Sequence, residues 1–285
     1  MVISIASGKG GTGKTTIAAN LAWVASTTGP VTFLDCDVEE PDAHFYLKPV
    51  WTGEEEVCVP APVIDSTRCD GCGKCAEFCR FNALAAIRGG VLVFEELCHG
   101  CGGCALACAS NCITYVDRRV GIVREGSRGS VCLFQGVLDI GEPFAVPVLR
   151  KVREHQAEQQ LTVIDSPPGT SCPMVNSIRG SDYCILVTEP SPFGRHDLDL
   201  AHRTATGLAV PHGVIINRSW SCDAVIEDYC NREGLDIIGR IPYSRALAEA
   251  CSRGELQTET HGDSSRQYTR ILEEVHGKCL IISPS

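Results

Sequence analysis

Eight cysteines follow one spacing twice along the chain. Each run has the form Cys-x2-Cys-x2-Cys-x3-Cys, first over residues 69–79 and again over residues 98–108. Three closely spaced thiolates can wrap one [4Fe–4S] cluster, while the fourth cysteine of such a run ligates the other cluster. The spacing therefore predicts two [4Fe–4S] clusters. The first is assigned to Cys69, Cys72, Cys75 and Cys108, and the second to Cys98, Cys101, Cys104 and Cys79.

The two cysteine runs belong to an internal repeat. Residues 68–76 align with residues 97–105, and Asn82 aligns with Asn111. Two copies of one short motif suggest a small module with approximate twofold symmetry. Zinc is the rival metal, but structural zinc prefers pairs of ligands separated by a longer gap. A disulfide framework is not expected either, because a reducing cytoplasm keeps clustered thiols available for metal.

The repeat resembles the cluster-binding motif of bacterial ferredoxins, with one departure. Proline usually follows the fourth cysteine in those proteins, whereas Arg80 and Ala109 stand there in this chain. The ligands are retained, and only the shape of the following loop is expected to differ. Cys112 falls at the repeat position of Ala83, so it is interpreted as a non-ligand, with a spare ligand as the alternative.

A glycine-rich loop near the N-terminus predicts a phosphate site. Residues 8–15 fit G-x-x-x-x-G-K-[ST], and they lie between a predicted strand and a predicted helix, as this motif requires. The backbone N–H groups and the helix N-terminus would cradle the phosphates. Lys14 is expected to reach the β- and γ-phosphates, and the Thr15 hydroxyl to ligate Mg²⁺. The predicted phosphate-binding set is Gly8, Lys9, Gly10, Gly11, Thr12, Gly13, Lys14, Thr15 and Thr16.

Strands and helices are expected to alternate on both sides of the cysteine-rich segment. A helix from Thr15 to about Thr28 lies between the first two strands. The strands are continuously apolar, as expected where helices cover both faces of a parallel sheet. Strands are predicted at residues 2–6, 31–35, 161–165, 184–188 and 213–217.

These elements predict an α/β fold with a doubly wound, mostly parallel sheet, interrupted by an α+β module that resembles a bacterial ferredoxin. Hairpin strands within residues 115–140 are expected to lead the chain back to the main sheet. The predicted domains are the first part of a P-loop ATPase domain at 1–59, the inserted two-cluster domain at 60–117, and the second part of the ATPase domain at 118–285.

An extra lysine in the phosphate loop gives the sequence a second resemblance. Lys9 makes the loop similar to the K-G-G-x-G-K-[ST] motif of the MinD/Mrp/ParA group of P-loop ATPases. In that group the first lysine crosses a dimer interface to the partner's bound phosphates. The resemblance implies Mg²⁺-dependent ATP hydrolysis and a nucleotide-dependent homodimer, or a heterodimer with a related ATPase.

The same resemblance suggests roles for residues at strand ends. Asp37 would orient or deprotonate the attacking water, with Asp35 as the alternative. Asp165 would hold Mg²⁺ through water, and the Gly169 N–H would sense the γ-phosphate.

The base is expected to be adenine. Guanine-specific P-loop proteins use N-K-x-D, and the corresponding segment here, Asn217-Arg-Ser-Trp, has no aspartate. Asn217 would contact the adenine amino group, and Pro242 would flank the ring.

The composition of the chain limits the classes of binding partner that we expect. The net charge of −10 and the lack of a Lys/Arg cluster argue against nucleic acid and acidic membranes. A first strand stands where a signal peptide would be, and no stretch of 18 apolar residues occurs, so a cytoplasmic protein without a membrane span is expected. The expected partners are a second ATPase subunit and a redox protein.

Three functions are consistent with the phosphate loop and the cysteine runs. In the favoured one, ATP gates electron transfer from the clusters to a partner, as in the nitrogenase iron protein. The second is a cluster carrier similar to Mrp, and the third is a positioning ATPase similar to MinD, with the clusters as a redox sensor. Cys172 lies seven residues after Asp165, where the nitrogenase iron protein has a cluster ligand. A buried small hydrophobe is the ordinary interpretation of Cys172. The alternative is that it holds a transferable cluster with its symmetry mate or contacts a redox partner.

Overall fold

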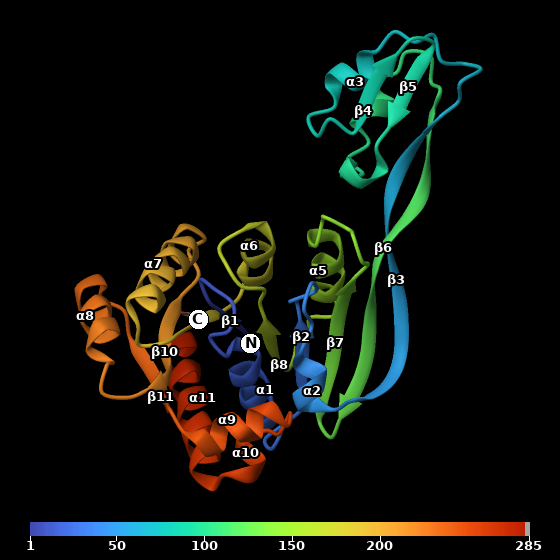
Figure 1. The fold of residues 1–285 in the computed structure, drawn as a ribbon. Helices are drawn as coiled ribbons and strands as arrows, with labels where there is room; N and C mark the ends of the chain where they lie inside the picture. The colour runs from blue at the N-terminus through green and yellow to red at the C-terminus, as the bar shows by residue number, and fades with distance from the viewer. Residues whose placement is uncertain (283–285) are drawn as a thin grey trace. The chain divides into compact units, whose positions relative to one another are not determined.

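Buried strands form the centre of the fold. The computed structural model describes residues 1–282, and in this part of the chain the main sheet has nine strands (Figure 1). In their order across the sheet they are β11 (Ile237–Pro242), β10 (His212–Ser219), β9 (Tyr183–Thr188), β1 (Val2–Ala6), β8 (Leu161–Asp165), β2 (Val31–Asp35), β7 (Val131–Leu138), β6 (Ile113–Arg128) and β3 (Val50–Ile64).

The central strands run parallel. β1 pairs with β8 and β9, β2 pairs with β8 and β7, and β10 pairs with β9 and β11, all in parallel register. Asp165 is the register partner of both Ile5 and Asp35. The carboxyl ends of β1, β2 and β8 therefore meet at one edge, which is where open α/β sheets bind ligands.

Helices connect these strands, and a small hairpin stands apart from the main sheet. The hairpin pairs β4 (Leu84–Ile87) with β5 (Gly90–Val93), and a 3₁₀ turn follows at Glu95–Leu97. The helices are α1 (Lys14–Ala25), α2 (Ala43–Leu47), α3 (Lys74–Phe78), α4 (Gly103–Leu106), α5 (Val146–Arg153), α6 (Cys172–Ile178), α7 (Pro192–Gly207), α8 (Ala224–Glu233), α9 (Arg245–Ser252), α10 (Gln257–Thr260) and α11 (Gly262–Ile282).

The two faces of the sheet bury separate apolar clusters. On one face α1 and α11 pack on side chains such as Phe33 and Ile185. On the other face α6, α7 and α8 pack on side chains such as Leu186 and Ile216. Because helices cover both faces, the prediction of an α/β fold with a mostly parallel, doubly wound sheet is confirmed for the main sheet.

The first helix ends earlier than the sequence predicted. It was expected to continue to about Thr28 but ends at Ala25. The hydroxyls of Ser26, Thr27 and Thr28 each donate to the carbonyl three residues earlier, at 2.7, 2.7 and 2.9 Å. These local bonds satisfy the last carbonyls of the helix and close it before Gly29 and Pro30.

The described chain divides into two compact units. The cysteine unit consists of Glu55–Ile122 together with Leu138–Val148, and the remaining described residues make the sheet unit. This division is wider than the predicted insertion at 60–117, since the segment after β7 is bound to β6 within the cysteine unit. Arg119 pairs with Asp139 at 2.9 Å, Arg118 pairs with Glu142, and the Asp139 N–H donates to the Val120 carbonyl at 3.0 Å.

Strand β3 is the element that the sequence prediction missed. Its first seven residues are exposed, and the run Glu54-Glu55-Glu56 shows no alternation of polar and apolar side chains. A strand that buries neither face until Val57 carries no hydrophobic periodicity. β3 is covalently continuous from the sheet unit into the cysteine unit, and β6 returns from it.

Candidate nucleotide site and cysteine unit

The phosphate loop joins β1 to α1 in a conformation that requires glycine. Gly11 and Gly13 have φ of 75° and 90°, the left-handed region that favours glycine. A Cβ at Gly13 would stand 2.4 Å from Asn217 Nδ2, and a Cβ at Gly8 would stand 2.1 Å from the Asp197 carbonyl oxygen. The loop is therefore packed closely against the segments that begin α7 and end β10.

A cavity of about 890 Å³ opens beside this loop in the sheet unit. Its walls include the loop, the segment after β2, the end of β10, and the segment that links β11 to α9. Tyr243, Leu247 and Cys251 add an apolar side to it. The predicted residues that line the cavity are Gly10, Gly11, Gly13, Lys14, Thr15, Thr16, Asp37, Asn217 and Pro242.

Asp165 ends β8 beside Lys14 and Thr15. Its side chain is fully buried, and neither carboxylate oxygen has a hydrogen-bond partner among the described residues. Burial raises the pKa of Asp165 to about 6, and the charge of Lys14 opposes that rise. A buried carboxylate that lacks a hydrogen-bond partner and lies beside a buried lysine is suited to bind a cation or a water molecule.

Asp35 and Asp37 differ in their freedom to act. Asp35 is fully buried, and its oxygens accept from Gln135 Nε2 at 2.8 Å, the Ala43 N–H at 3.2 Å and the Asp37 N–H at 3.3 Å. Burial and the neighbouring Asp165 raise its pKa well above the usual range. Asp37 instead lines the cavity, and burial with the charge of Asp165 raises its pKa to about 7. Of these two aspartates, only Asp37 lines the cavity.

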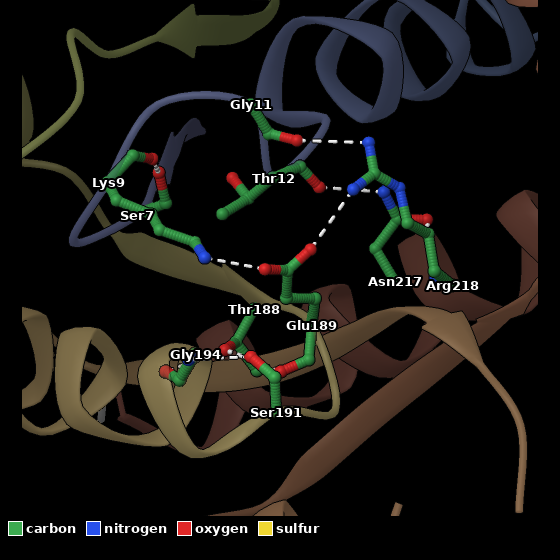
Figure 2. Close-up of polar contacts among 10 residues, drawn as sticks. All are labelled: Ser7, Lys9, Gly11, Thr12, Thr188, Glu189, Ser191, Gly194, Asn217 and Arg218. Carbon is green, nitrogen blue, oxygen red and sulfur yellow. Dashed lines mark hydrogen bonds and ion pairs between the residues drawn. The ribbon is translucent and has the colours of Figure 1, made fainter. Parts of the chain in front are cut away.

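Lys9 points away from its own phosphate cradle, toward Glu189. Its Nζ lies 2.5 Å from Glu189 Oε1, and Arg218 Nη1 lies 3.0 Å from Glu189 Oε2 (Figure 2). The same guanidinium donates to the Gly11 carbonyl at 3.1 Å. The hydrogen bond with Lys9, more than any other contact, lowers the pKa of Glu189. Sequence reasoning missed both Glu189 and Arg218, although Glu189 directly follows β9, where α/β sheets place site residues.

Two residues that were predicted to contact the nucleotide form hydrogen bonds with the phosphate loop or its flanking residues instead. The Asn217 side-chain amide donates to the Thr12 carbonyl at 2.7 Å, and its oxygen accepts from the Arg218 N–H at 3.0 Å. The Gly169 N–H donates to the Ser7 carbonyl at 3.0 Å, with Gly169 at a φ of 91°. Both residues therefore support the phosphate loop in this structure, and their contacts to a base or a γ-phosphate stay predictions.

The internal repeat is visible in the backbone of the cysteine unit. Gly71 and Gly100 have φ of 69° and 64°, Gly73 and Gly102 have 73° and 75°, and Asn82 and Asn111 have 54° and 48°. Short helices α3 and α4 begin at equivalent positions after these glycines. Two sequence copies thus adopt one unusual local conformation, which sequence similarity alone does not require.

Four predicted ligands meet around one small cavity of about 130 Å³. They are the set assigned to the second cluster: Cys79, Cys98, Cys101 and Cys104. The Gly100 N–H donates to Cys98 Sγ at 3.4 Å, and Tyr115 Oη lies 3.3 Å from Cys104 Sγ. Cys79 comes from the first repeat and the other three from the second, and their assignment to one cluster stays a prediction.

The four cysteines assigned to the first cluster are less clearly grouped in the structure. Cys108 Sγ lies 3.4 Å from Sγ of Cys112, a buried thiol that was interpreted as a non-ligand. Among residues 1–282, no three Cys, His, Asp or Glu side chains lie close enough together to hold a single metal ion. A cluster differs from a single ion, because each thiolate binds a different iron atom.

Cys172 is exposed at the start of α6. Its interpretation as a buried small hydrophobe is therefore wrong. Ser171, at the N-cap position, has an extended backbone just before the helix.

Comparisons with known proteins give the chain its family. Residues 3–257 match the model of the CobQ/CobB/MinD/ParA nucleotide binding domain. The chain belongs to this family. The nucleotide-binding domain is accordingly a P-loop ATPase domain of MinD/ParA type, as the resemblance implied.

The chain is similar to several individual proteins. An uncharacterized protein of Methanocaldococcus jannaschii is 31% identical over 220 residues, with 76% of this chain and 78% of that protein covered. An iron–sulfur cluster carrier protein of the same organism is 24% identical, with 97% and 85% covered. The septum site-determining protein MinD from Pyrococcus horikoshii, solved with Mg-ADP, has a TM-score of 0.62 at 18% identity, with 100% and 99% covered. This last likeness shows the fold alone.

No helix in the described part of this family member is long and apolar enough to cross a membrane. The expected cytoplasmic location stays a prediction.

Proposed function

We propose that the protein is an ATP-hydrolysing iron–sulfur protein, a homodimer or a heterodimer with a related ATPase, in which the nucleotide state controls electron transfer between its clusters and a partner protein. This proposal rests on strand β3, which joins the sheet unit covalently to the cysteine unit. Val50 begins β3 only 13 residues after Asp37, and β3 runs without a break into the unit that holds the eight predicted ligands. A change at the γ-phosphate that moves Asp37 therefore acts on the chain leading to the clusters.

The residues of the phosphate site fit an ATP–Mg²⁺ complex. The orphaned carboxylate of Asp165 and the hydroxyl of Thr15 are oxygen donors, which Mg²⁺ prefers. When bound, Mg²⁺ neutralises charge on the β- and γ-phosphates. The buried Lys14 would stabilise the same phosphates, and its burial strengthens that interaction.

Hydrolysis by this arrangement needs a water in line with the γ-phosphate. Asp37 would orient that water or accept its proton, because its carboxylate faces the cavity and its pKa of about 7 suits a base near neutral pH. Asp35 would hold Asp37 in place through the Asp37 N–H. Lys9 of a partner subunit would add positive charge to the phosphates in the transition state.

The residues of the second cysteine set fit a [4Fe–4S] cluster. Four thiols line one cavity, and an N–H donor reaches one of the sulfurs, as second-shell donors do around clusters. When bound, such a cluster carries one electron at a time. The protein's part is to supply the thiolates, to exclude water with Phe78, Phe81 and Leu84, and to set the charge near the cluster through Arg80.

Electron transfer can be tested with reduced protein and an acceptor dye. Protein reduced by dithionite, freed of excess reductant, is mixed anaerobically with an oxidised viologen in a stopped-flow instrument. We expect the rate of dye reduction to change at least severalfold when Mg-ATP is present, and ADP to have a smaller effect. Identical rates with and without nucleotide would remove the proposal of ATP-controlled transfer.

A cluster carrier is the second candidate, and one observation favours it. Cys172 is exposed, and the chain resembles an iron–sulfur cluster carrier protein at 24% identity. A carrier would hold an additional labile cluster between two Cys172 thiols in a dimer. Iron above about eight atoms per subunit in the wild type, lost in Cys172→Ser, would favour this function; equal iron content in both would exclude it.

A further inference from the structure

Lys9 forms an ion pair with Glu189 of its own chain. This pair involves the Lys9 ammonium, the group that would contact the partner's phosphates in the proposed dimer. The Lys9 ammonium lies 2.5 Å from Glu189 Oε1. To reach a phosphate on another subunit, this ammonium must give up the contact with Glu189 or share its N–H donors between the carboxylate and the phosphate. Figure 2 shows the side chain directed toward Glu189 rather than along the phosphate loop.

Glu189 is held in place independently of Lys9. The turn after β9 is fixed by Thr188 Oγ1, which donates to the Gly194 carbonyl at 2.9 Å, and by Ser191 Oγ, which accepts from the Gly194 N–H at 2.9 Å and caps α7. A Cβ at Gly194 would stand 2.2 Å from the Glu189 carbonyl oxygen, so the turn is closely packed. The backbone at Glu189 is thus fixed by its own turn, and its carboxylate has a second cationic partner in Arg218.

Arg218 keeps the Glu189 carboxylate neutralised when Lys9 leaves. Its guanidinium bridges Glu189 Oε2 at 3.0 Å and the Gly11 carbonyl at 3.1 Å. Arg218 has a φ of 54°, a left-handed conformation that its flanking contacts must maintain. Because Glu189 retains one cation, releasing Lys9 does not strand an unpaired, partly buried charge.

We propose that Glu189 is a latch that holds Lys9 in its own subunit until a nucleotide triphosphate offers more negative charge than one carboxylate does. The proposal rests on the proposed function, in which Lys9 acts on the phosphates of the partner. Glu189 is then a positioning residue, which acts through Lys9 and does not touch the nucleotide. Glu189 therefore makes dimerisation depend on the γ-phosphate. ATP attracts Lys9 to the partner subunit, whereas ADP, which lacks the γ-phosphate, does not.

Symmetry doubles the effect of the latch. A dimer with twofold symmetry opens two copies of the pair, so any change per subunit enters the dimerisation constant squared. Lys9 and Glu189 are partly exposed, at 33% and 22%, and exposed pairs change equilibria by only a few fold. About threefold per subunit corresponds to about tenfold in the dimer dissociation constant.

The test measures dimerisation of Glu189→Gln, which keeps the side-chain shape and removes its charge. Sedimentation velocity of the full chain is recorded anaerobically with a non-hydrolysable ATP analogue and with ADP. We expect the dimer dissociation constant with the ATP analogue to fall about tenfold, and a dimer to appear with ADP at protein concentrations where the wild type stays monomeric. An unchanged constant with both nucleotides would overturn the latch.

Two controls separate the latch from other effects. Glu274→Gln removes a carboxylate from another partly exposed pair, with Lys278 at 3.4 Å, and should leave dimerisation as in the wild type. In a Lys9→Ala background, Glu189→Gln should have no further effect, because the latch acts only through Lys9. A further effect there would also overturn it. A wild type that never dimerises with the ATP analogue would instead defeat the dimer of the proposed function.

Discussion

The side-chain amide of Asn217 donates to the Thr12 carbonyl at 2.7 Å, which joins the end of β10 to the phosphate loop. Asn217 was expected from the sequence to contact the base, and this bond gives it an additional role in shaping the loop. The relationship explains why a Cβ at Gly13 would stand 2.4 Å from Asn217 Nδ2. The loop, the strand end and the cavity wall therefore depend on one another.

Asn217→Ala should weaken nucleotide binding. The substitution removes the bond to Thr12 and leaves a loop carbonyl without its partner, a loss of about 1 kcal/mol or more. We expect the dissociation constant for Mg-ADP, measured by calorimetry, to rise about five- to tenfold. Asn176→Ala, which removes an amide bonded to the Cys172 carbonyl, is the matched control and should not change it. An Asn217→Ala protein with wild-type affinity would argue against the supporting role.

Asp37→Asn should slow ATP hydrolysis without a matching loss of ATP binding. An amide cannot accept the water's proton, so kcat should fall about 100-fold while KM changes little. The wild-type rate should also decline as the pH falls below about 7, since burial raises the pKa of Asp37 to about 7 and protonation removes the base. A variant that keeps the wild-type rate would instead point to another group.

Asp35→Asn tests the alternative aspartate. Asp35 accepts three hydrogen bonds and is fully buried, so its loss should reduce stability and ATP binding together. A selective loss of kcat in Asp35→Asn, with normal stability, would assign the base to Asp35.

Asp165→Asn should make the nucleotide-free protein more stable at alkaline pH. Burial raises the folded-state pKa of Asp165 to about 6 from the usual 3.8, so the folded protein binds more protons than the unfolded chain between these values. Stability contributed by this group is therefore lost as the pH rises from about 4 to about 6. At pH 8 the variant should be more stable by up to about 2–3 kcal/mol, and this gain should shrink at pH 5.

Thermal unfolding in EDTA at the two pH values measures this difference, and a gain independent of pH would contradict it. The same variant should lose the dependence of ATP affinity on Mg²⁺, since Asp165 is the orphaned carboxylate of the site. Retained Mg²⁺ dependence would mean that other oxygens hold the ion.

Cys79→Ser should damage the cluster of the second repeat rather than the first. Cys79 lines one cavity with Cys98, Cys101 and Cys104, although it lies in the first repeat. Iron in anaerobically reconstituted protein should fall from about eight to about four atoms per subunit. Cys98→Ser should give the same EPR spectrum as Cys79→Ser, and the exposed Cys58→Ser should match the wild type. Different remaining clusters in Cys79→Ser and Cys98→Ser would disprove the crossed assignment.

Most of the sheet unit follows from patterns that local chemistry determines. Buried strands such as residues 161–165 are continuously apolar, and the glycines of the phosphate loop have the positive φ that only glycine adopts readily. The four cysteines assigned to the second cluster line one cavity, and their ligation of a cluster stays a prediction. For the strands and the phosphate loop, the deciding information lies within a few residues of sequence.

The parts that the sequence did not predict depend on distant contacts. Glu189 gains its meaning only from Lys9, 180 residues earlier, and from Arg218. The segment after β7 joins the cysteine unit through Arg118 and Arg119, and surface charges carry no periodicity that would announce such a contact. Strand β3 is exposed over its first half, so no hydrophobic pattern marked it.

In the proposed function, the state of the bound nucleotide changes the redox properties of the clusters. An anaerobic EPR-monitored redox titration of the full chain, with no nucleotide, with ADP and with a non-hydrolysable ATP analogue, tests it most directly. We expect two [4Fe–4S]⁺ signals, and a midpoint potential that differs between the ATP analogue and ADP by more than about 30 mV, a threefold change in a one-electron equilibrium. Absence of both signals, or potentials that are identical in all three states, would contradict it.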